Sequence, residues 1–558
     1  MNSAHEQRNR VTDRAILSNY LPGHVVEQLL IANQPASADL APVIERLQAL
    51  LHTIVSFVPE YTDFLHSTPV AGQPGQLHST TGTLLAADLS GFTAFSAQLS
   101  TLGSEGAEIV AHTINTLFSM LIGTLAEWDG RLLKLSGDAL TALFIGSGHA
   151  HRAATTALEL QRRMGEFAAL ATPVGVFTLR IRIGLASGSV QLAQVGSAQR
   201  LELLVAGEPA REVVDHQRHA SPGAVVLGNA TADELQAQKP RFSALGPGYH
   251  CLEALAPAAP SPPPAPFTWA TRADAAWELH ALVNHIEALR PYLLDQHLAR
   301  LSDGPPTLAS QGELRPVTML FANLSDAGQL LASASADSAE AMPSIQARIE
   351  QIWQIVEQYG GAVNKLDLHP DGHTLIVLFG APIAQSRDAE QAVGCALALM
   401  HTLGAGGPLQ LRRIGVASGR VFAGAVGSPS RREYTVMGAA VNLAARLMDA
   451  AENGQILLDA TTARAAEHRF KLQAQPPVRA KGYTHLVPCF TPELDEGPRL
   501  NLLTRAHGPL VGRAADLARA RAAVDQALGG AGGSIALVGE AGIGKSRLLA
   551  ELVHDELL

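Results

Sequence analysis

The sequence has few cysteines, few aromatic residues and no dense run of basic residues. Its three cysteines, Cys251, Cys395 and Cys489, lie far apart in 558 residues. A disulfide framework or a zinc cluster needs closer spacing, so we expect three reduced thiols. Acidic residues (51) outnumber Lys and Arg (41), which gives a net charge of −10. This balance argues against nucleic acid or an anionic membrane as a main partner, because both attract clustered cations.

Long hydrophobic runs are also missing, although 47% of the residues are hydrophobic. No uninterrupted apolar run reaches the length of a membrane span. The stretch from Met1 to Arg8 lacks the apolar core of a signal peptide. We therefore expect no transmembrane segment and a cytoplasmic protein.

The length predicts about four domains, and composition suggests where they divide. Pro- and Gly-rich stretches separate blocks of regular apolar periodicity. The predicted divisions are an N-terminal helical segment and linker (1–80), a first globular domain (81–253), a Pro-rich linker with a helical segment (254–311), a second globular domain (312–492), and a last segment (493–558).

Two short apolar runs in the first globular domain each end at an aspartate. Leu85 to Phe95 reads as a strand that reaches Asp88, a turn at Gly91 and the start of a helix. Arg131 to Phe144 reads as two strands joined by a turn that contains Asp138. A single aspartate at a strand end is more often a turn residue or helix cap. Two of them in one domain are able to face each other and hold divalent metal.

The predicted elements of this domain follow the order β-α-β-β-α-β. A long helix over 104–128 separates the first strand from the hairpin, and an Ala-rich helix over 149–169 precedes a strand over 177–186. This order is the ferredoxin-like split β-α-β unit, an α+β fold. The N-terminal region, with a helical pattern at about 41–57, is interpreted as a helical bracket packed on the next domain, and a further helical segment is predicted at about 273–301.

An internal repeat relates the two globular domains. Pro316 to Leu324 matches the first aspartate strand, with Asn323 where Asp88 stands. In the second hairpin Lys365 aligns with Lys134, and His373 aligns with Asp138. The second copy therefore lacks both aspartates.

The losses in the two copies are complementary. Aligning Gly207 with Gly438 places Arg211 opposite Asn442 and Asp215 opposite Arg446. Asn442 and Arg446 are four residues apart on one helical face, which by itself is more often a solvated surface. A pseudo-twofold pair of α+β domains in one chain would nevertheless assemble one complete set in one interface cleft, with a degenerate cleft opposite.

The assembled residue types suit phosphoryl chemistry. Two carboxylates are able to hold two metal ions, and an Arg and an Asn aimed at a phosphate stabilise charge that develops there. Lys365 and Thr435 are able to hydrogen-bond the edge of a base.

On these motifs, over roughly residues 81–492, the chain resembles a class III nucleotidyl cyclase of the soluble adenylate cyclase type. In that family two unlike catalytic domains share one polypeptide, followed by an NTPase-like region. The resemblance implies that ATP is converted to 3′,5′-cyclic AMP and pyrophosphate with two Mg²⁺ (or Mn²⁺) ions. It implies these roles: Asp88, Asp138 and the Leu89 carbonyl as metal ligands; the Ser90, Gly91, Phe92 and Thr93 backbone and Arg182 on phosphates; Lys365, Thr435 and the Val436 backbone on adenine; Asn442 on the ribose; Arg446 on the transition state.

Two of these positions have a second interpretation. The alternative for Arg182 is an ordinary surface arginine at the edge of a strand. Lys134 lies in the degenerate cleft, where the resemblance implies a bicarbonate pocket of a Lys, a Val backbone and an Arg. Lys134 and Val205 match that pocket, whereas its Arg position falls on Val214, and Arg211 is offered as a substitute. The alternative for Lys134 is a strand lysine paired with a nearby carboxylate.

The last segment contains a phosphate-binding loop motif. Gly539, Gly544, Lys545 and Ser546 satisfy G-x-x-x-x-G-K-S between an apolar strand and a helix. We interpret 493–558 as the start of a truncated P-loop NTPase domain. Three alternatives stay open: a guanylate cyclase, an inactive cyclase pair acting as a sensor, and a P-loop signalling ATPase with the cyclase pair as its input. Lys365 and Thr435 favour adenine, and the retained aspartates and Arg446 favour an active enzyme.

Overall fold

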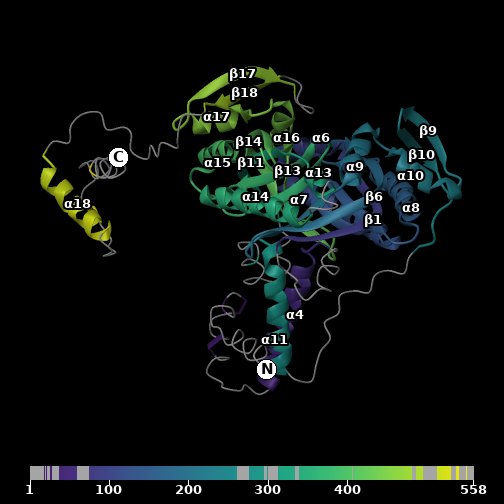
Figure 1. Ribbon diagram of the computed structural model, residues 1–558, viewed down its shortest axis with the longest axis horizontal. Helices are drawn as coiled ribbons and strands as arrows, with labels where there is room; N and C mark the ends of the chain where they lie inside the picture. Colours follow the sequence, from purple (N-terminus) through teal and green to yellow (C-terminus); the bar gives the residue numbers. More distant parts are fainter. Residues whose placement is uncertain are drawn as a thin grey trace. The chain divides into compact units, whose positions relative to one another are not determined.

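The computed structural model of the chain describes most of both globular domains (Figure 1). It describes residues 37–59, 74–260, 275–294, 312–332, 338–404, 406–479, 486–493 and 512–528, with a few isolated positions elsewhere. The chain divides into two compact units, Met1–Glu493 and Leu494–Leu558. The P-loop residues Gly539, Gly544, Lys545 and Ser546 lie outside the described residues, so that motif stays a prediction.

The first copy has the predicted β-α-β-β-α-β order and then continues the sheet. Its strands are ordered β2-β3-β1-β6-β8-β10-β9, with β7 paired to β6. The elements are β1 (Gln76–Ser90), α6 (Phe92–Leu99), α7 (Ser104–Glu127), β2 (Arg131–Ser136), β3 (Ala139–Ile145), α8 (His149–Arg163), β6 (Arg180–Gly196), β7 (Leu201–Ala206), α9 (Glu208–His219), β8 (Val225–Leu227), α10 (Asn229–Glu234), β9 (Arg241–Gly246) and β10 (Tyr249–Ala254).

The second copy repeats this sheet position for position. Its order is β12-β13-β11-β14-β16-β18-β17, with β15 paired to β14. The predicted pair of ferredoxin-like domains is therefore confirmed. The elements are β11 (Glu313–Leu324), α13 (Ala327–Ala332), α14 (Ser338–Gln358), β12 (Ala362–His369), β13 (Gly372–Phe379), α15 (Asp388–Leu403), β14 (Leu411–Gly427), β15 (Arg432–Met437), α16 (Ala439–Ala450), β16 (Ile456–Asp459), α17 (Ala460–Ala466), β17 (Leu472–Val478) and β18 (Val487–Pro492).

Helix α7 shows how the apolar pattern builds the core. Ile114, Leu117, Leu121 and Leu125 recur at helical spacing and are all buried. Its stretch Glu108–Glu127 is the one helix among the described residues with the length and hydropathy of a membrane span. Here that apolar surface packs against the first sheet and, at its edge, against the second copy.

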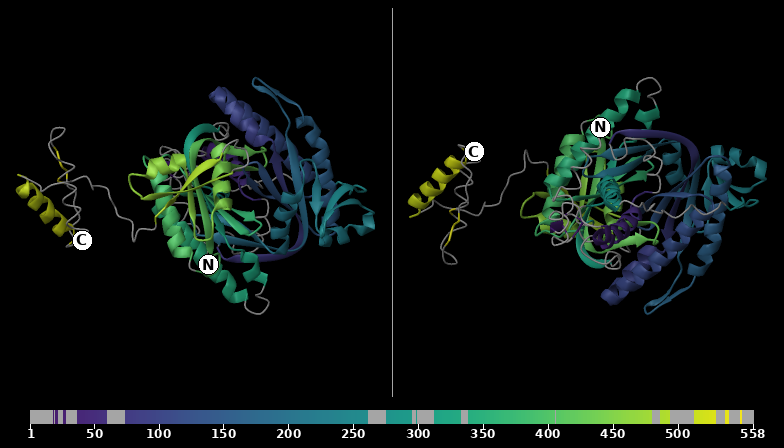
Figure 2. Two further views of the ribbon diagram at one scale, coloured as in Figure 1. Left: turned by 90° about the horizontal axis from the view of Figure 1, so that it is seen from above. Right: turned by 90° about the horizontal axis from the view of Figure 1, so that it is seen from below.

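The two copies pack against each other (Figure 2) through equivalent pairs of elements: α7 with β14 and α14 with β6, and β2 with β15 and β12 with β7. Asn115 Oδ1 on α7 accepts the Gly427 N–H at 3.1 Å, and Gln346 Oε1 on α14 accepts the Gly196 N–H at 3.1 Å. The counterparts stand 231 positions apart (346 − 115 = 231 and 427 − 196 = 231). Each copy therefore holds the hairpin of the other in the same way.

Helices α4 (Ser37–Val55) and α11 (Ala275–Leu289) overlap the two predicted helical stretches and lie side by side (Figure 1). Their apolar faces share one core, and Gln48 Nε2 donates to Glu278 Oε1 at 2.8 Å. Within the described residues, the predicted helical segment 273–301 is not one continuous α-helix. The helix ends at Leu289 and a 3₁₀ turn, Arg290–Tyr292, follows, because Pro291 has no N–H to continue the α-helical ladder.

Candidate active site

Strand β1 brings Asp88 to the edge of the first sheet beside the turn that contains Asp138. Asp88 pairs with Ala139 of β3 on one side and with Arg182 of β6 on the other. The Leu89 N–H donates to the Asp138 carbonyl at 3.1 Å. The backbone of β1 and β3 therefore places the two predicted metal ligands next to each other.

The two carboxylates are close enough to affect each other. Burial, followed by the Asp88 carboxylate, raises the pKa of Asp138 to about 7, and Arg182 and Arg446 oppose that shift. Arg182 also donates a charge-assisted hydrogen bond to Asp88 Oδ2. Arg182 thus contacts the carboxylate predicted to bind metal rather than facing solvent as a strand-edge arginine.

A glycine in the loop after β1 allows the loop backbone to pass close to the Thr178 carbonyl. Gly91 has φ of +96°, and a Cβ there would lie 2.6 Å from the Thr178 carbonyl. The Phe92 side chain is buried in the core, so its backbone is the part available to a phosphate. The loop runs directly into α6, whose first N–H groups have no partner within the helix.

Helix α16 of the second copy reaches across to this loop. Asn442 Nδ2 donates to Thr93 Oγ1 at 2.8 Å. Arg446, one turn further along α16, interacts electrostatically with Asp138 and forms an ion pair with Asp449 at 3.2 Å. Its side chain is 43% exposed. Helix α16 therefore lies beside the β1 loop and the Asp138 turn of the first copy.

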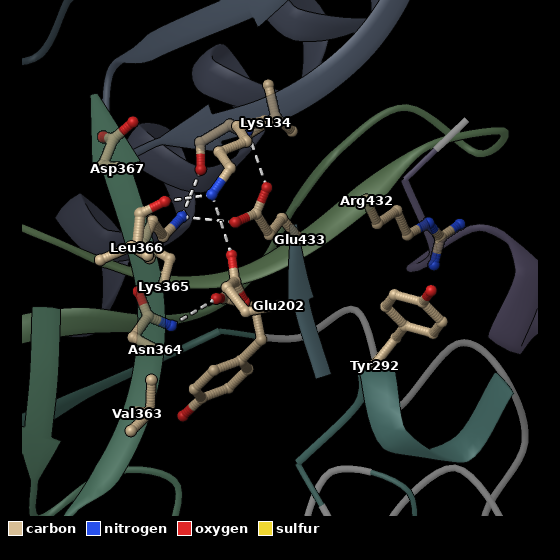
Figure 3. Close-up of polar contacts among 12 residues, drawn as sticks. Lys134, Glu202, Tyr292, Val363, Asn364, Lys365, Leu366, Asp367, Arg432 and Glu433 are labelled. Atoms are coloured by element: carbon tan, nitrogen blue, oxygen red, sulfur yellow. Dashed lines mark hydrogen bonds and ion pairs between the residues drawn. The ribbon is translucent and has the colours of Figure 1, made fainter. Parts of the chain in front are cut away.

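Lys365 lies deeper in the same interface, where it is 1% exposed. Its Nζ donates to Glu433 Oε1 at 2.6 Å and to the Leu135 carbonyl of the first copy (Figure 3). Burial disfavours the charge on Glu433, yet Lys365 and Arg431 hold its pKa below the ordinary value. Among the described residues, these two hydrogen bonds use two of the three donors of the Lys365 ammonium.

Thr435 and Val436 follow Glu433 on β15, and both are buried. Thr435 pairs with Gly424, and Val436 pairs with Ala423, on β14. The two residues predicted to read a base therefore lie on the same short strand as the carboxylate that binds Lys365.

The opposite cleft contains the pseudo-symmetric counterpart of the lysine pair. Lys134 Nζ donates to Glu202 Oε1 at 3.1 Å and to the Leu366 carbonyl of the second copy (Figure 3). Lys134 is 4% exposed. Its interpretation as a strand lysine paired with a carboxylate therefore describes the structure.

The other residues of the predicted regulatory pocket do not converge on Lys134. The Val205 carbonyl accepts a hydrogen bond from His373 Nε2 at 3.0 Å, and Arg211 is exposed on α9. Val214, at the position where the resemblance implies an Arg, packs with Leu368 in an apolar cluster. The Val205 carbonyl is thus bonded to His373, Lys134 is bonded to Glu202, and Arg211 lies at the surface.

Neutral polar residues replace the aspartates in the second copy. Asn323 is fully buried, and its Nδ2 lies 3.3 Å from His369 Nδ1. Burial lowers the pKa of His373, which favours its neutral form. The Asn323 and His373 positions are therefore filled by contacts within the protein.

Glu433 and Glu202 were missed in the sequence. Each is the second residue of its strand, β7 or β15, and stands three residues before Val205 or Val436. That recurrence at the repeat spacing was the available signal, because a buried carboxylate needs a cationic partner.

Asp88 and Asp138 fit the predicted metal ions in chemistry. Two adjacent carboxylates that already attract the Arg182 guanidinium form a cation-seeking site. Among the described residues, no group of three or more His, Cys, Asp or Glu side chains is arranged to hold a metal. Further ligands would have to come from the Leu89 carbonyl, substrate phosphates or water, which is common for Mg²⁺.

Comparison with known proteins agrees with this arrangement. The family model for the adenylate and guanylate cyclase catalytic domain matches residues 78–248 and 310–491. The chain is 27% identical to adenylate cyclase type 10 of Homo sapiens and 29% identical to that of Rattus norvegicus, over 66% of this chain and 24% of each relative. It thus spans about a quarter of the length of these curated relatives. A class III adenylyl cyclase-like ATP-binding protein from Pseudomonas aeruginosa aligns with 75% of this chain and 93% of that protein, at 14% identity and a TM-score of 0.49.

Two matched regions together cover more than half of the chain, and each coincides with one of the two sheets. The chain therefore belongs to the family of adenylate and guanylate cyclase catalytic domains, and it carries that domain twice.

Proposed function

We propose that the chain is an adenylate cyclase that forms 3′,5′-cyclic AMP and pyrophosphate from ATP in the Asp88–Asp138 cleft. The observation that carries the proposal is the hydrogen bond between Asn442 and Thr93, at 2.8 Å. It joins α16 of the second copy to the phosphate-binding loop of the first. This contact supports the assignment of residues from both copies to one catalytic site.

Asp88 and Asp138 would hold the two divalent ions, with the Leu89 carbonyl as a further ligand. Bound there, the ions would supply positive charge that favours deprotonation of a hydroxyl and offsets charge on the phosphates. Ser90 to Thr93 would donate backbone N–H groups to the triphosphate. Arg182 would exchange Asp88 for a phosphate oxygen, since the metal ions would take over the carboxylate.

Helix α16 would act on the reacting end of the nucleotide. Asn442 would orient the ribose so that its 3′-oxygen faces the α-phosphate. Arg446 is half exposed and lies within electrostatic range of Asp138, so its guanidinium would stabilise charge that develops on the α-phosphate.

The preference for adenine would come from Lys365, Thr435 and the Val436 backbone. The remaining Lys365 donor would meet an acceptor nitrogen of adenine, and the Thr435 hydroxyl is able to donate or accept. A guanine offers a donor N–H at the ring position where adenine has an acceptor. The lysine would therefore disfavour guanosine triphosphate, which is the substrate of the alternative guanylate cyclase.

The direct test measures cyclic AMP and cyclic GMP formed by the 558-residue chain with Mg²⁺ or Mn²⁺. We expect cyclic AMP formation from ATP, and little cyclic GMP from GTP. Faster turnover of GTP than of ATP would overturn the base assignment. Absence of both products with either metal would favour the inactive sensor pair.

The degenerate cleft is a second, regulatory candidate, for which bicarbonate is the predicted small anion and Lys134, Val205 and Arg211 the predicted contacts. A ligand there would have to compete with Glu202 for Lys134 and with His373 for the Val205 carbonyl. Adding bicarbonate at roughly 20–40 mM, well above a weak millimolar affinity, tests it. An unchanged rate of cyclic AMP formation would remove this role.

We also propose a cytoplasmic location, since all three cysteines are free thiols. Fractionation of cells that express the chain tests this.

A further inference from the structure

A cavity lies at the junction of the two copies, and none of the residues assigned to the catalytic or regulatory site lines it. It has a volume of about 430 Å³ and lies between helix α7 of the first copy and the β14–β15 hairpin of the second. A water molecule in liquid fills about 30 Å³, and small-molecule pockets span roughly 300–1,000 Å³. The cavity therefore has room for a small organic molecule.

Six of the nine residues that line the cavity have polar side chains, and one of these carries a permanent positive charge. Among the described residues that line the cavity, none is acidic. The helix contributes polar side chains on one face, and the hairpin contributes a hydroxyl and a guanidinium. The polar lining residues are His112, Asn115, Thr116, Ser119, Ser428 and Arg432.

Arg432 supplies the positive charge of this cavity. The backbone N–H of Arg432 donates to the Ser56 carbonyl at 2.5 Å, and its side-chain Nε donates to the Ser428 carbonyl at 3.3 Å. No carboxylate among the described residues forms an ion pair with Arg432, and burial lowers its pKa. In Figure 3 it stands apart from the Lys134–Glu433 network. A half-buried guanidinium without a carboxylate is best stabilised by an external anion.

The equivalent junction, between α14 of the second copy and the β6–β7 hairpin of the first, lacks this arginine and contains an acidic residue. With the same offset of 231, Leu201 replaces Arg432 and Glu350 replaces Ser119 (432 − 201 = 231 and 350 − 119 = 231). There Gln346 Nε2 donates to Glu350 Oε1 at 2.7 Å and also to the Gly196 carbonyl. The fold therefore does not require an arginine at this place.

We propose that this cavity binds a small phosphate-bearing molecule, with the phosphate on Arg432 and the remainder along Thr116 and Ser119. A guanidinium and hydroxyl donors are the groups that recognise phosphate oxygens. The ligand would contact α7 of one copy and the hairpin of the other, and so stabilise the assembled pair. This site is separate from the proposed cyclase cleft, and its test does not depend on cyclase activity.

The test titrates inorganic phosphate and glycerol 3-phosphate into the 558-residue chain by calorimetry, with the melting temperature as a second readout. The Arg446→Ala background is used throughout, because the active-site cleft is itself expected to attract phosphate. We expect glycerol 3-phosphate to bind more tightly than inorganic phosphate, because only it occupies the rest of the cavity.

Two variants and one control locate the binding. Arg432→Leu copies the other junction and is expected to weaken binding at least about tenfold. Ser119→Glu places a carboxylate on an exposed helix position and is expected to do the same without disturbing the fold. Arg420→Leu, an exposed arginine on β14 outside the cavity, is expected to leave binding unchanged.

Three results would overturn the proposal. They are no binding of either compound at millimolar concentration, equal binding by the parent and both variants, and equal loss in the Arg420→Leu control.

Discussion

The two copies of the domain differ most where the first carries aspartates. Asp88 and Asp138 are partly exposed and stay close to two arginines, whereas Asn323 and His373 are buried and bond to neighbouring protein groups. The same backbone thus builds an open anionic edge in one copy and a closed neutral one in the other. A carboxylate pair is tolerated only where cations or water reach it.

The two copies agree where they hold each other together. Lys134 with Glu202 and Lys365 with Glu433 are equivalent buried pairs, and each lysine also reaches a carbonyl of the other copy. Features present in both copies stabilise the interface. Features present in only one copy are the candidates for chemistry, and the following predictions test that division.

The largest effect is expected from Asp88→Asn. It removes a charge needed to hold metal, so cyclic AMP formation should fall about a thousandfold, or about 4 kcal/mol of barrier. The matched control is Asp371→Asn, because Asp371 forms the comparable ion pair with Arg413 in the second copy at 2.7 Å. That control should stay within about threefold of the parent. Equal losses in both variants would contradict the one-cleft assignment.

The second prediction distinguishes the role of Lys365 from that of Lys134. Lys134→Met and Lys365→Met each remove the shorter ion-pair partner of an interface glutamate and leave only an arginine at 3.4 Å (Arg200 to Glu202) or 3.9 Å (Arg431 to Glu433), so each should lower the free energy of unfolding by about 2–4 kcal/mol. Only Lys365→Met should also reduce the preference for ATP over GTP. Denaturant unfolding and paired nucleotide assays measure the two effects. A loss of preference in Lys134→Met alone would reverse the roles of the two clefts.

Arg446→Ala should lower kcat about a hundredfold with KM within about threefold, because its charge is needed mainly in the transition state. Arg218→Ala is the control, since Arg218 occupies the equivalent helix α9 and contacts His369 on the other side. Steady-state kinetics of cyclic AMP formation distinguish the two. A rise in KM with unchanged kcat in Arg446→Ala would make this arginine a substrate-binding group only.

The smallest effect is expected from Thr93→Val. It removes one hydrogen bond between the copies, worth about 1 kcal/mol, and should slow cyclic AMP formation about fivefold. Thr101→Val serves for comparison, because the Thr101 hydroxyl donates to the Gln98 carbonyl within its own copy at 2.6 Å. If Thr93→Val is as active as the Thr101 variant, the Asn442–Thr93 contact has no part in positioning.

Much of the fold was predictable because its signals are local. Strand and helix periodicity located the β-α-β-β-α-β order, and the repeat located the aspartates lost from the second copy. Strand pairing was not predictable at this level. The Asp88–Arg182 ion pair depends on the register of β1 against β6, and the Lys365–Glu433 pair depends on two strands packing at the interface.

The sequence by itself determined that two unequal copies exist and which residue types each one carries, because repeats and strand-end residues are recorded in local order. Only the tertiary structure decided which side chains meet. Asn442 and Thr93 are 349 positions apart, and their contact requires both sheets to be complete and docked. Contacts of that range arise from packing of whole domains and leave no periodic trace in the chain.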